Sequence, residues 1–491
     1  MGYSRTVGSA DTDILLPPGE SARSVGSTVK GIKSYFSASA WFRYASIVVA
    51  VLCLCIACAR VLFSTSLKVF DSSSWRFVTA NGTVFMDGDN PFYVVGFNIH
   101  NLMEIAMPQI RKSMDTHAPD TVDGVLAQLQ QDGVNVIRVF AHTTDPRYPF
   151  QESPGVYNDD AFASLDYILA SCKIHGIRVI LSMADSWKYR GGVQEFIDFS
   201  ETAPPRPEKY TPPINVDGDF DYSRMTRAQE DYEKQRMMLF FSDEGTQRLY
   251  KNHLDTILRR KNTITGIQYK EDPTIFSLSL INEMRCESSP ATSTCPEAVQ
   301  AWISDVVEHV RSIDTQHMLT IGEEGFYSST KARRKYNPAN WAESSGQDFI
   351  RDHQAHPGIS YASIHIWPST WQCDDDVASS DFTVEDWISS HMEDARNVLQ
   401  KPLLIEEFGY PISSSSADSA KDIQNLRKPI VDLVYAYVNQ SIHEGNSLQG
   451  SVLWEYSLRM YKGAATNQYG ISRGSTTYNL MKQHAHSIRH M

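Results

Sequence analysis

The amino-acid sequence predicts an α/β fold, a (β/α)8 TIM barrel whose inner ring of parallel strands is covered by helices. Beyond residue 75, short runs rich in β-branched residues alternate with stretches of helical periodicity. Most of these runs are almost continuously apolar, which is typical of strands covered on both faces. Eight such βα units in one chain indicate this barrel, and the sequence contains no evident second globular domain or repeat.

The eight apolar runs are the expected strands, in chain order. They are Phe92–Gly96, Val134–Ala141, Ile177–Ala184, Ile275–Glu283, Met318–Glu323, Tyr361–Trp367, Pro402–Gly409 and Gly450–Tyr456. Between them, Asp160–Lys173 places its apolar residues on one helical face, and Gly176 follows as a helix end. A short hairpin over Arg76–Asp89, with Asn81-Gly82 at its turn, is predicted to close the bottom of the barrel.

The composition limits the class of protein. Of the 491 residues, 42% are apolar and 21% are charged, which are usual values for a chain that buries a large core. These values exclude a mainly disordered, collagenous or multi-pass membrane protein. The 45 Lys and Arg residues against 58 Asp and Glu give a net charge of −13, which argues against a nucleic-acid partner.

The N-terminal residues predict the compartment. Residues 1–44 indicate a disordered tail, and residues 45–63 form an apolar run that is just long enough for one tilted transmembrane helix. Cations before this run predict a cytosolic tail and a type II membrane protein. Ala57-Cys58-Ala59 keeps open the alternative of a cleaved signal peptide. In both cases the barrel domain, residues 64–491, lies in the lumen or outside the cell, anchored or secreted.

Cysteine usage agrees with an oxidising compartment. Cys286 and Cys295 lie nine positions apart across a Ser/Pro/Thr loop and are expected to form a disulfide. Cys172 is expected to be a buried free thiol, and Cys373 has no obvious partner. Asn81 and Asn439 stand in sequons for glycosylation.

Polar and aromatic side chains stand at the C-terminal ends of the predicted strands, where barrel enzymes carry their chemistry. Glu283 ends strand four and Glu407 ends strand seven, across the barrel mouth. Two carboxyl groups about 5–5.5 Å apart serve as acid/base and nucleophile in retaining glycoside hydrolysis, so the sequence predicts such a pair. The other strand ends carry Asn98, His100, Arg138, Asp185, Trp187, Asn282, His365, Trp367 and Trp454.

Several motifs accompany these strand ends in a specific order and spacing. They are GFN at Gly96–Asn98, WKYRGGVQEF at Trp187–Phe196, YKEDPTI at Tyr269–Ile275, INEMRCES at Ile281–Ser288, EEGFY at Glu323–Tyr327, HIWPSTW at His365–Trp371 and KPLLIEEFG at Lys401–Gly409. Together they resemble glycoside hydrolase family 5, in the endo-β-1,4-mannanase branch of plants and fungi. The resemblance runs from about Ser74 to Arg473.

The resemblance implies a role for each matching residue. Glu283, the Glu of the Asn-Glu pair, matches the general acid/base, and Glu407, directly before Phe-Gly, matches the nucleophile. Asn282 is expected to hydrogen-bond the 2-hydroxyl of the sugar. Arg138 is expected to lie beneath Glu407 and to keep it ionised.

The remaining matches concern the walls of the site. His365 matches the strand-six histidine, and Trp454 matches the tryptophan that forms the floor for the bound sugar. Trp187 is interpreted as a further substrate contact. Glu406 is expected to point away from Glu407, because adjacent strand residues alternate between faces. The resemblance implies a monomer that needs neither a cofactor nor a metal.

Three positions depart from the family pattern. Trp367 replaces a tyrosine that contacts the nucleophile, and an indole donates a hydrogen bond but cannot accept one. His100-Asn101 replace an aromatic pair after strand one, and Asp185-Ser186 replace an Asn-Asn pair before Trp187. These changes affect the expected sugar-binding surface more than the expected reaction.

The expected function is endo-acting, retaining hydrolysis of internal β-1,4-mannosidic bonds in mannan, glucomannan or galactomannan, with transglycosylation as a related outcome. One alternative is a β-1,4-glucanase or another β-glycosidase on the same barrel. A second alternative is a catalytically inactive polysaccharide-binding protein. Retention of both Glu283 and Glu407 argues against this second alternative.

Other polar clusters are interpreted as structural. Glu323-Glu324 are expected to support the site or to be solvated, and Asp374–Asp376 are expected to form a solvated loop and not a Ca²⁺ site. The Pro-rich segment Phe199–Tyr222 is expected to wall the cleft. The C-terminal histidines are interpreted as part of a frayed polar tail: His484, His486 and His490.

Overall fold

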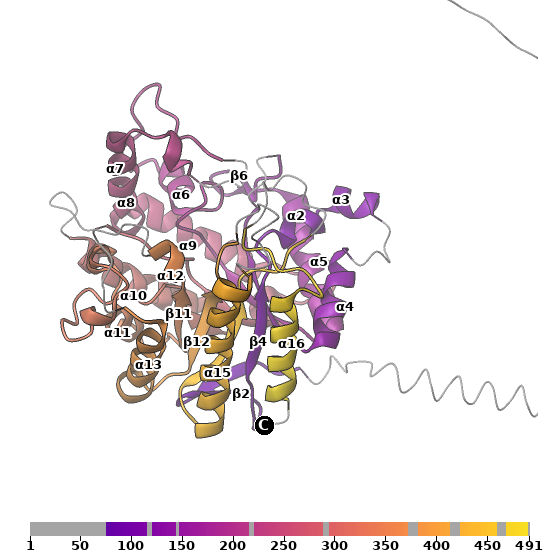
Figure 1. Ribbon diagram of the computed structural model, residues 1–491. Helices are drawn as coiled ribbons and strands as arrows, with labels where there is room; N and C mark the ends of the chain where they lie inside the picture. Colours follow the sequence, from indigo (N-terminus) through magenta and orange to yellow (C-terminus); the bar gives the residue numbers. More distant parts are fainter. Residues whose placement is uncertain are drawn as a thin grey trace, which may run out of the picture. The chain divides into compact units, whose positions relative to one another are not determined.

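The computed structural model describes residues 75–114, 120–143, 147–215, 220–287, 294–371, 382–412, 423–458 and 468–489 (Figure 1). The predicted tail 1–44, the apolar run 45–63, Cys373 and Asp374–Asp376 lie outside these ranges. Among the described helices, none combines the length and the apolar character that crossing a membrane requires.

Eight parallel strands form one sheet, in the order β10-β9-β8-β5-β4-β13-β12-β11. Two backbone hydrogen bonds join the ends of this order: Ser360 N to Leu319 O at 2.7 Å, and His365 N to Glu324 O at 3.0 Å. The sheet therefore fits a (β/α)8 barrel, and each predicted strand is confirmed. The strands are β4 (Val94–Asn98), β5 (Val136–Phe140), β8 (Arg178–Ser182), β9 (Ile275–Ser279), β10 (Met318–Thr320), β11 (Ala362–Ile366), β12 (Leu403–Phe408) and β13 (Leu448–Leu453).

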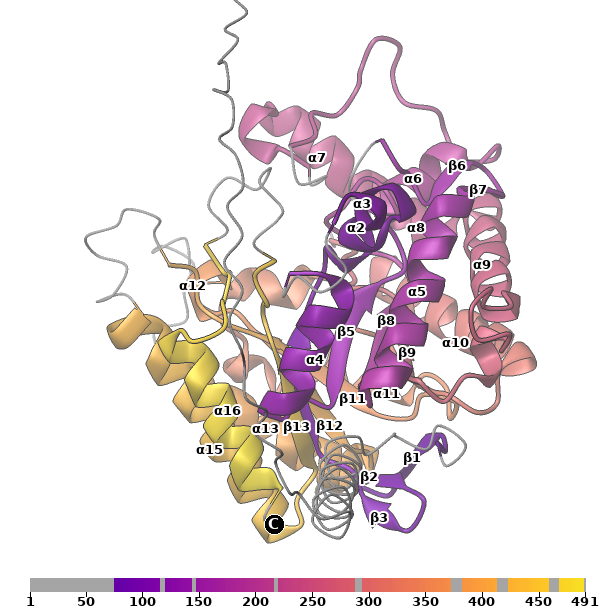
Figure 2. The same ribbon diagram turned by 90° about the vertical axis from the view of Figure 1, so that its right-hand side faces the viewer.

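Helices lie outside the ring of strands, as Figures 1 and 2 show. The predicted helix around Asp160 is confirmed and begins where Asn158 caps it, by accepting from Asp160 N and Ala161 N. It ends at Gly176, whose left-handed backbone suits glycine. The helices are α2 (Leu102–Ala106), α3 (Pro108–Ser113), α4 (Val122–Asp132), α5 (Asp159–His175), α6 (Val193–Phe199), α7 (Arg227–Arg236), α8 (Met238–Ser242), α9 (Glu244–Arg259), α10 (Cys295–Ile313), α11 (Phe349–Gln354), α12 (Pro368–Trp371), α13 (Val384–Asp394), α15 (Lys428–Glu444) and α16 (Thr476–Ile488).

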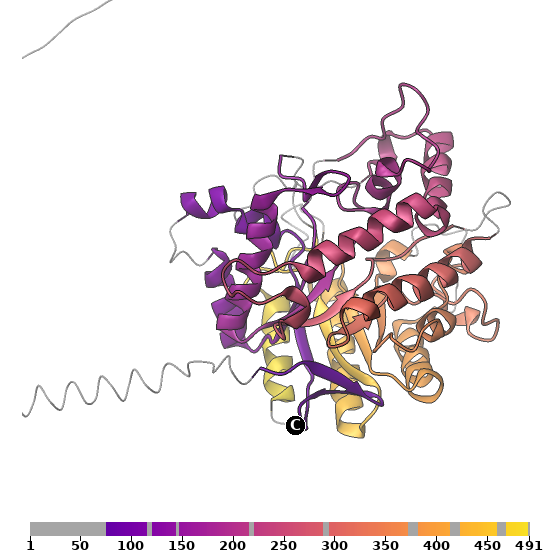
Figure 3. The same ribbon diagram turned by 180° about the vertical axis from the view of Figure 1, so that it is seen from behind.

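The predicted hairpin closes the N-terminal end of the barrel, seen in indigo at the lower end in Figure 3. It consists of β1 (Val78–Asn81) and β2 (Val84–Asp87), and β3 (Asn90–Pro91) adds a third short strand. Phe85 is fully buried and packs edge-on against Phe276 and Tyr361 inside the barrel, with ring centroids 5.2 and 5.3 Å away. Its burial stabilises the bottom of the barrel by roughly 2–3 kcal/mol.

The C-terminal helix α16 corrects the expectation of a frayed tail for His484 and His486, and His490 lies outside the described residues. His484 is only 3% exposed and stacks on Tyr435 of α15, with ring centroids 4.0 Å apart. Figure 2 shows α15 and α16 side by side. The sequence pattern was misleading because His484 lies on the buried face of this helix with Tyr478 and Met481, while His486 lies on its exposed face.

The cysteine predictions within the described residues are confirmed. Cys286 and Cys295 form a disulfide with Cα atoms 5.6 Å apart, and it ties the segment after β9 to the start of α10. Cys172 is a buried free thiol on the inner face of α5. Burial raises the pKa of this thiol well above its usual value, so Cys172 is expected to be unreactive.

Candidate active site

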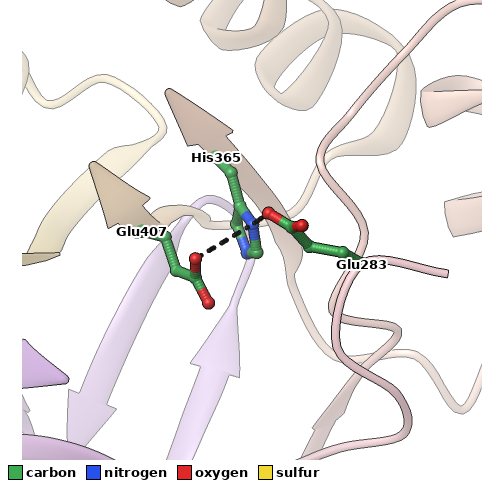
Figure 4. Close-up of side chains that lie close together, drawn as sticks. All are labelled: Glu283, His365 and Glu407. Atoms are coloured by element: carbon green, nitrogen blue, oxygen red, sulfur yellow. Dashed lines mark hydrogen bonds and ion pairs between the residues drawn. The ribbon is translucent and has the colours of Figure 1, made fainter. Parts of the chain in front are cut away.

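Glu283, His365 and Glu407 converge at the C-terminal end of the barrel (Figure 4). Glu407 lies in β12, His365 in β11, and Glu283 follows β9. One carboxylate oxygen of each Glu and one nitrogen of His365 all lie within 4.8 Å of one another. This spacing corresponds to the short separation of retaining glycosidases and is well below the roughly 6.5–9.5 Å of inverting ones.

His365 lies between the two carboxyl groups and is hydrogen-bonded to Glu283. Its Nδ1 lies 2.6 Å from Glu283 Oε1 and 3.6 Å from Glu407 Oε2. Burial lowers the pKa of the imidazole to about 3, so the ring is neutral at neutral pH. A neutral imidazole can exchange a hydrogen bond with either carboxyl group without adding a charge to the site.

Arg138 supports Glu407 from within the barrel. Its Nη1 donates to Glu407 Oε1 at 2.5 Å and to Asn98 Oδ1 at 3.1 Å, and its Nη2 donates to Asn282 Oδ1 at 2.8 Å. The guanidinium is completely buried. One planar cation therefore fixes a carboxylate and two amides, as its forked donors allow.

Trp367 holds the other oxygen of Glu407. Its Nε1 donates to Glu407 Oε2 at 3.3 Å. The indole lies against Gly409, where an added Cβ would come within 3.1 Å of the indole ring. Gly409, the last residue of the KPLLIEEFG motif, has no Cβ and therefore leaves room for the indole of Trp367 to reach the Glu407 carboxylate.

Both carboxyl groups hold a proton more tightly than free carboxyl groups do. Burial raises the pKa of Glu283, opposed by the charges of Arg285 and Arg138. Burial also raises the pKa of Glu407, well above its usual range; Arg138 opposes this shift and the charge of Glu283 adds to it. The two carboxyl groups together are therefore suited to hold one proton, so that one group is protonated while the other is ionised.

Glu406 corrects the expectation that it points away from Glu407. Ile364 pairs with Ile405, but the next residue, His365, pairs with Glu407, so a β-bulge leaves Glu406 as an extra residue. Glu406 lies fully buried, accepts from Tyr361 Oη at 2.8 Å and lies 4.0 Å from Arg138 Nε. Because of the bulge, strict alternation fails and Arg138 faces both carboxylates.

The backbone of Glu283 is strained. Its φ is +48°, in the left-handed region that costs a residue with a Cβ about 1–2 kcal/mol. Trp187 Nε1 donates to its Oε2 at 2.5 Å, and its backbone N donates to Gly322 O at 2.8 Å. The strain therefore persists because contacts on both sides hold the carboxyl group toward His365.

A cavity of about 470 Å³ opens beside Glu283. Trp187, Trp341, Trp371 and Arg285 are among its lining residues, and Lys234 of α7 reaches it from the insertion after β8. Arg285 donates to Glu324 Oε1 at 2.6 Å and lies 4.8 Å from the ring of Trp341. Aromatic faces with a few polar groups suit sugar rings.

Most of the residues that line this cavity were not predicted from the sequence. Arg285 had a signal, because it lies in INEMRCES two positions after Glu283, and Trp371 ends HIWPSTW. Trp341 lies in no motif that marks it as a site residue.

Glu323 and Glu324 are not solvated: both are buried, and burial raises their pKa values to about 8 and about 7. The segment expected to wall the cleft does lie against the site, because Phe220 N donates to Trp187 O at 3.4 Å.

Trp454 lies near Trp367, with ring centroids 6.3 Å apart. Its ring is half-buried and stacks on His100, with centroids 5.6 Å apart and planes 10° from parallel. His100 Nδ1 pairs with Glu455. Burial alone would lower the pKa of His100, but the charge and hydrogen bond of Glu455 raise it above its usual value. The residue that replaces an aromatic side chain here thus forms an ion pair that sequence analysis did not predict.

Glu283, His365 and Glu407 are also the one group of described residues whose spacing would suit a metal ion. Their ligand atoms are engaged with one another, with Arg138 and with two indole N–H groups. A cation at Arg138 and donors that point at both carboxylates fit acid/base and nucleophilic chemistry better than a metal centre.

Comparison with known proteins gives the family. Residues 75–469 match the family model described as GH family 5 beta-mannosidase-like. The chain belongs to glycoside hydrolase family 5. It is 31% identical over 421 residues to mannan endo-1,4-beta-mannosidase 7 of Arabidopsis thaliana, which covers 84% of this chain and 86% of that protein. It is 34% identical over 383 residues to mannan endo-1,4-beta-mannosidase 1 of Oryza sativa subsp. japonica, covering 77% and 78%.

Solved structures agree on the fold. The endo-1,4-beta-mannanase of Rhizomucor miehei superposes with a TM-score of 0.61 at 21% identity, and covers 84% of this chain and all of that one. A family 5 mannosidase of the same organism gives a TM-score of 0.63 at 20% identity, covering 85% and 98%. At these identities the similarity supports the family 5 barrel, while the chemistry rests on the site itself.

Proposed function

We propose that this family 5 protein is an endo-acting retaining glycosidase that cleaves internal β-1,4-mannosidic bonds of mannan, glucomannan or galactomannan. The observation that carries the proposal is the Glu283–Glu407 pair, whose nearest oxygens lie within 4.8 Å of each other. The mannan specificity is supported by relatives at 31% and 34% identity that are mannan endo-1,4-beta-mannosidases.

Glu407 is the proposed nucleophile. Arg138 donates directly to it and Trp367 donates to its other oxygen, so the negative charge of a singly protonated pair is best placed there. A Glu407 oxygen attacks the anomeric carbon and forms a covalent glycosyl ester. The bond from that carbon to the leaving oxygen breaks at the same time.

Glu283 is the proposed acid/base. In the first step its proton passes to the leaving oxygen, so the departing sugar leaves as a neutral alcohol. In the second step the Glu283 carboxylate takes a proton from water, which attacks the anomeric carbon and releases Glu407 as the carboxylate. The same step with a sugar hydroxyl in place of water gives transglycosylation.

The two sides of the pair suit two parts of a polysaccharide. Trp454 gives an aromatic face close to Trp367, the residue that donates to Glu407, and we assign this face to the attacked sugar. The cavity with Trp341 and Arg285 lies beside Glu283, where the leaving sugars bind. Asn282, held by Arg138, is positioned for the 2-hydroxyl of the attacked sugar.

A β-1,4-glucanase is the alternative on the same barrel, since His100 and Trp367 change the sugar-binding surface. No described residue favours a glucan substrate over mannan.

The proposal includes a location outside the cytosol, with the protein either anchored by residues 45–63 or secreted. The Cys286–Cys295 disulfide supports it, because such bonds persist in oxidising compartments.

The experiment that tests the roles compares Glu407→Ala with Glu283→Ala on β-mannan, with and without azide. Glu407→Ala is expected to lose turnover by about 10³-fold or more, and azide is expected to give an α-mannosyl azide. Glu283→Ala is expected to give the β-azide from an aryl mannoside that needs no acid. Substantial turnover by Glu407→Ala without azide, in a protein with unchanged melting temperature, contradicts the assignment.

A further inference from the structure

Asp185 lies after the end of β8, in the loop that leads to Trp187. Its backbone forms isolated β-bridges with Asn282 and Gly192, and the residue is only 2% exposed. Its carboxylate accepts hydrogen bonds from two residues that contact the pair or its arginine, Trp187 and Asn282.

Three N–H groups converge on the two oxygens of Asp185. Trp187 N and Lys188 N donate to Oδ1, at 2.6 and 3.3 Å. Asn282 Nδ2 donates to Oδ2 at 3.3 Å. A carboxylate can accept on both sides, but an asparagine offers one accepting oxygen and must present its own NH₂ to the other side. The donors therefore match aspartate and not asparagine.

Hydrogen bonds connect Asp185 to both catalytic carboxyl groups through other residues. Asn282 Oδ1 accepts from Arg138, which donates to Glu407. With Arg138 on Oδ1 and Asp185 on Nδ2, the Asn282 amide has one defined orientation and keeps a second N–H for the substrate. On the other branch, the indole of Trp187 donates to Glu283.

The charge of Asp185 also acts on the site. It adds to the effects that raise the pKa of Glu407 and that of Arg138. His142 lies with Nε2 4.0 Å from Asp185 Oδ2, but burial lowers its pKa to about 3, so it is neutral and does not offset this charge. Neither ring nitrogen of His142 has a hydrogen-bond partner among the described residues.

Other titratable groups face Glu407 from each surrounding element. Glu406 precedes it in β12, His365 lies on β11, Arg138 lies on β5, and Glu283 follows β9. Arg138 is the cation among them, and Glu406 shares it with Glu407. An additional carboxylate from Asp185 thus makes the surroundings of Glu407 more negative.

We propose that Asp185 is a positioning residue for this reaction: its carboxylate orients Asn282 and Trp187 toward the Glu283–Glu407 pair. The inference rests on the proposed function of that pair. It concerns a position where the sequence departs from the family pattern.

Asp185→Asn tests the inference, with Asp166→Asn as the matched control. Asp166 is another buried carboxylate with several donors, among them Arg260 and Tyr269, and it lies in α5 on the outer ring of helices. The measurements are melting temperature, kcat and KM on mannohexaose, and kcat/KM against pH. For Asp185→Asn we expect kcat to fall at least about tenfold, the scale of one lost hydrogen bond to a charged group.

The pH profile separates charge from folding. Loss of the Asp185 charge lowers the pKa of Glu407. The acid limb, which is the rise of kcat/KM with pH on the acidic side of the profile, is therefore expected to move to lower pH by about 0.5 unit or more. Asp166→Asn is expected to lower the melting temperature without moving the limb. Asp185→Glu keeps the charge and displaces the oxygens, so we expect a lowered kcat with an unmoved limb.

An Asp185→Asn protein with the kcat and acid limb of the wild type overturns the inference and leaves the proposed function standing. If Asp185→Asn does not fold, Asp185→Glu decides: an unchanged kcat overturns the inference and a lowered kcat with an unmoved limb supports it. A wild-type protein that cleaves no mannan overturns the proposed function, and the inference with it.

Discussion

The imidazole of His365 lies between Glu283 and Glu407, 2.6 Å from an oxygen of the first and 3.6 Å from an oxygen of the second. Because burial lowers its pKa to about 3, this ring does not titrate near neutral pH. The pH dependence of activity is therefore expected to belong to the two carboxyl groups. The acid limb reports the first ionisation of the pair and the basic limb reports the second, because the reaction needs the pair to hold one proton.

Arg138→Lys is expected to move the acid limb of kcat/KM to higher pH. Arg138 lowers the pKa of Glu407, so a shorter cation that reaches it less well leaves that pKa higher, and more alkaline conditions are needed for the carboxylate. We also expect kcat to fall about 100-fold, because lysine cannot hold Glu407, Asn98 and Asn282 together. A pH series on mannohexaose measures both, and an acid limb at lower pH would be inconsistent with this account.

Trp367→Phe removes the indole N–H that donates to Glu407 at 3.3 Å and keeps an aromatic ring. We expect kcat to fall about three- to tenfold, the effect of one modest hydrogen bond, with KM less affected. Trp302→Phe is the control, because the Trp302 indole is buried in the core and its Nε1 has no hydrogen-bond partner among the described residues. Equal kcat values for the two variants would show that the indole donor does not support Glu407.

Glu283→Gly and Glu283→Ala are expected to differ in stability although both lose activity. Both remove the carboxyl group, but only glycine adopts φ near +48° without a Cβ penalty. The glycine variant is therefore expected to be about 1 kcal/mol more stable than the alanine variant. Urea unfolding followed by circular dichroism measures this difference, and a more stable alanine variant would contradict the strain at this position.

His484→Phe is expected to stabilise the protein more at pH 5 than at pH 8. Burial lowers the pKa of His484 from 6.5 to about 3, so below pH 6.5 the unfolded chain takes up a proton that the folded chain refuses. Stability is therefore lost as the pH falls, by about 2 kcal/mol at pH 5, and phenylalanine removes this loss while keeping the stack on Tyr435. Melting curves at both pH values test it; an equal gain at the two values would argue against a neutral buried His484.

Local pattern was sufficient to predict the framework. The strand that precedes Glu283 and the strand that carries Glu407 are apolar runs that are fully buried, and the barrel places their C-terminal ends together. The same reasoning predicted the hairpin, although its loop residues are Gly82 and Thr83, one position later than expected.

Contacts between distant segments could not be predicted in this way. The bulge at Glu406 depends on how β12 meets β11, and no residue of KPLLIEEFG signals an extra residue. The pairing of His100 with Glu455 joins positions 355 apart in the chain. Trp341 reaches the cavity because the chain after β10 returns over Arg285, which only the folded structure reveals.

The central claim is that Glu283 and Glu407 carry out retaining cleavage of β-mannan. The most direct measurement is proton NMR of the products as they form, with the full chain acting on β-1,4-mannohexaose and, in parallel, on cellohexaose. We predict shorter mannose oligosaccharides released first as the β-anomer, with much slower cleavage of cellohexaose or none. Initial release of the α-anomer, or cleavage of cellohexaose in preference to mannohexaose, would contradict the account.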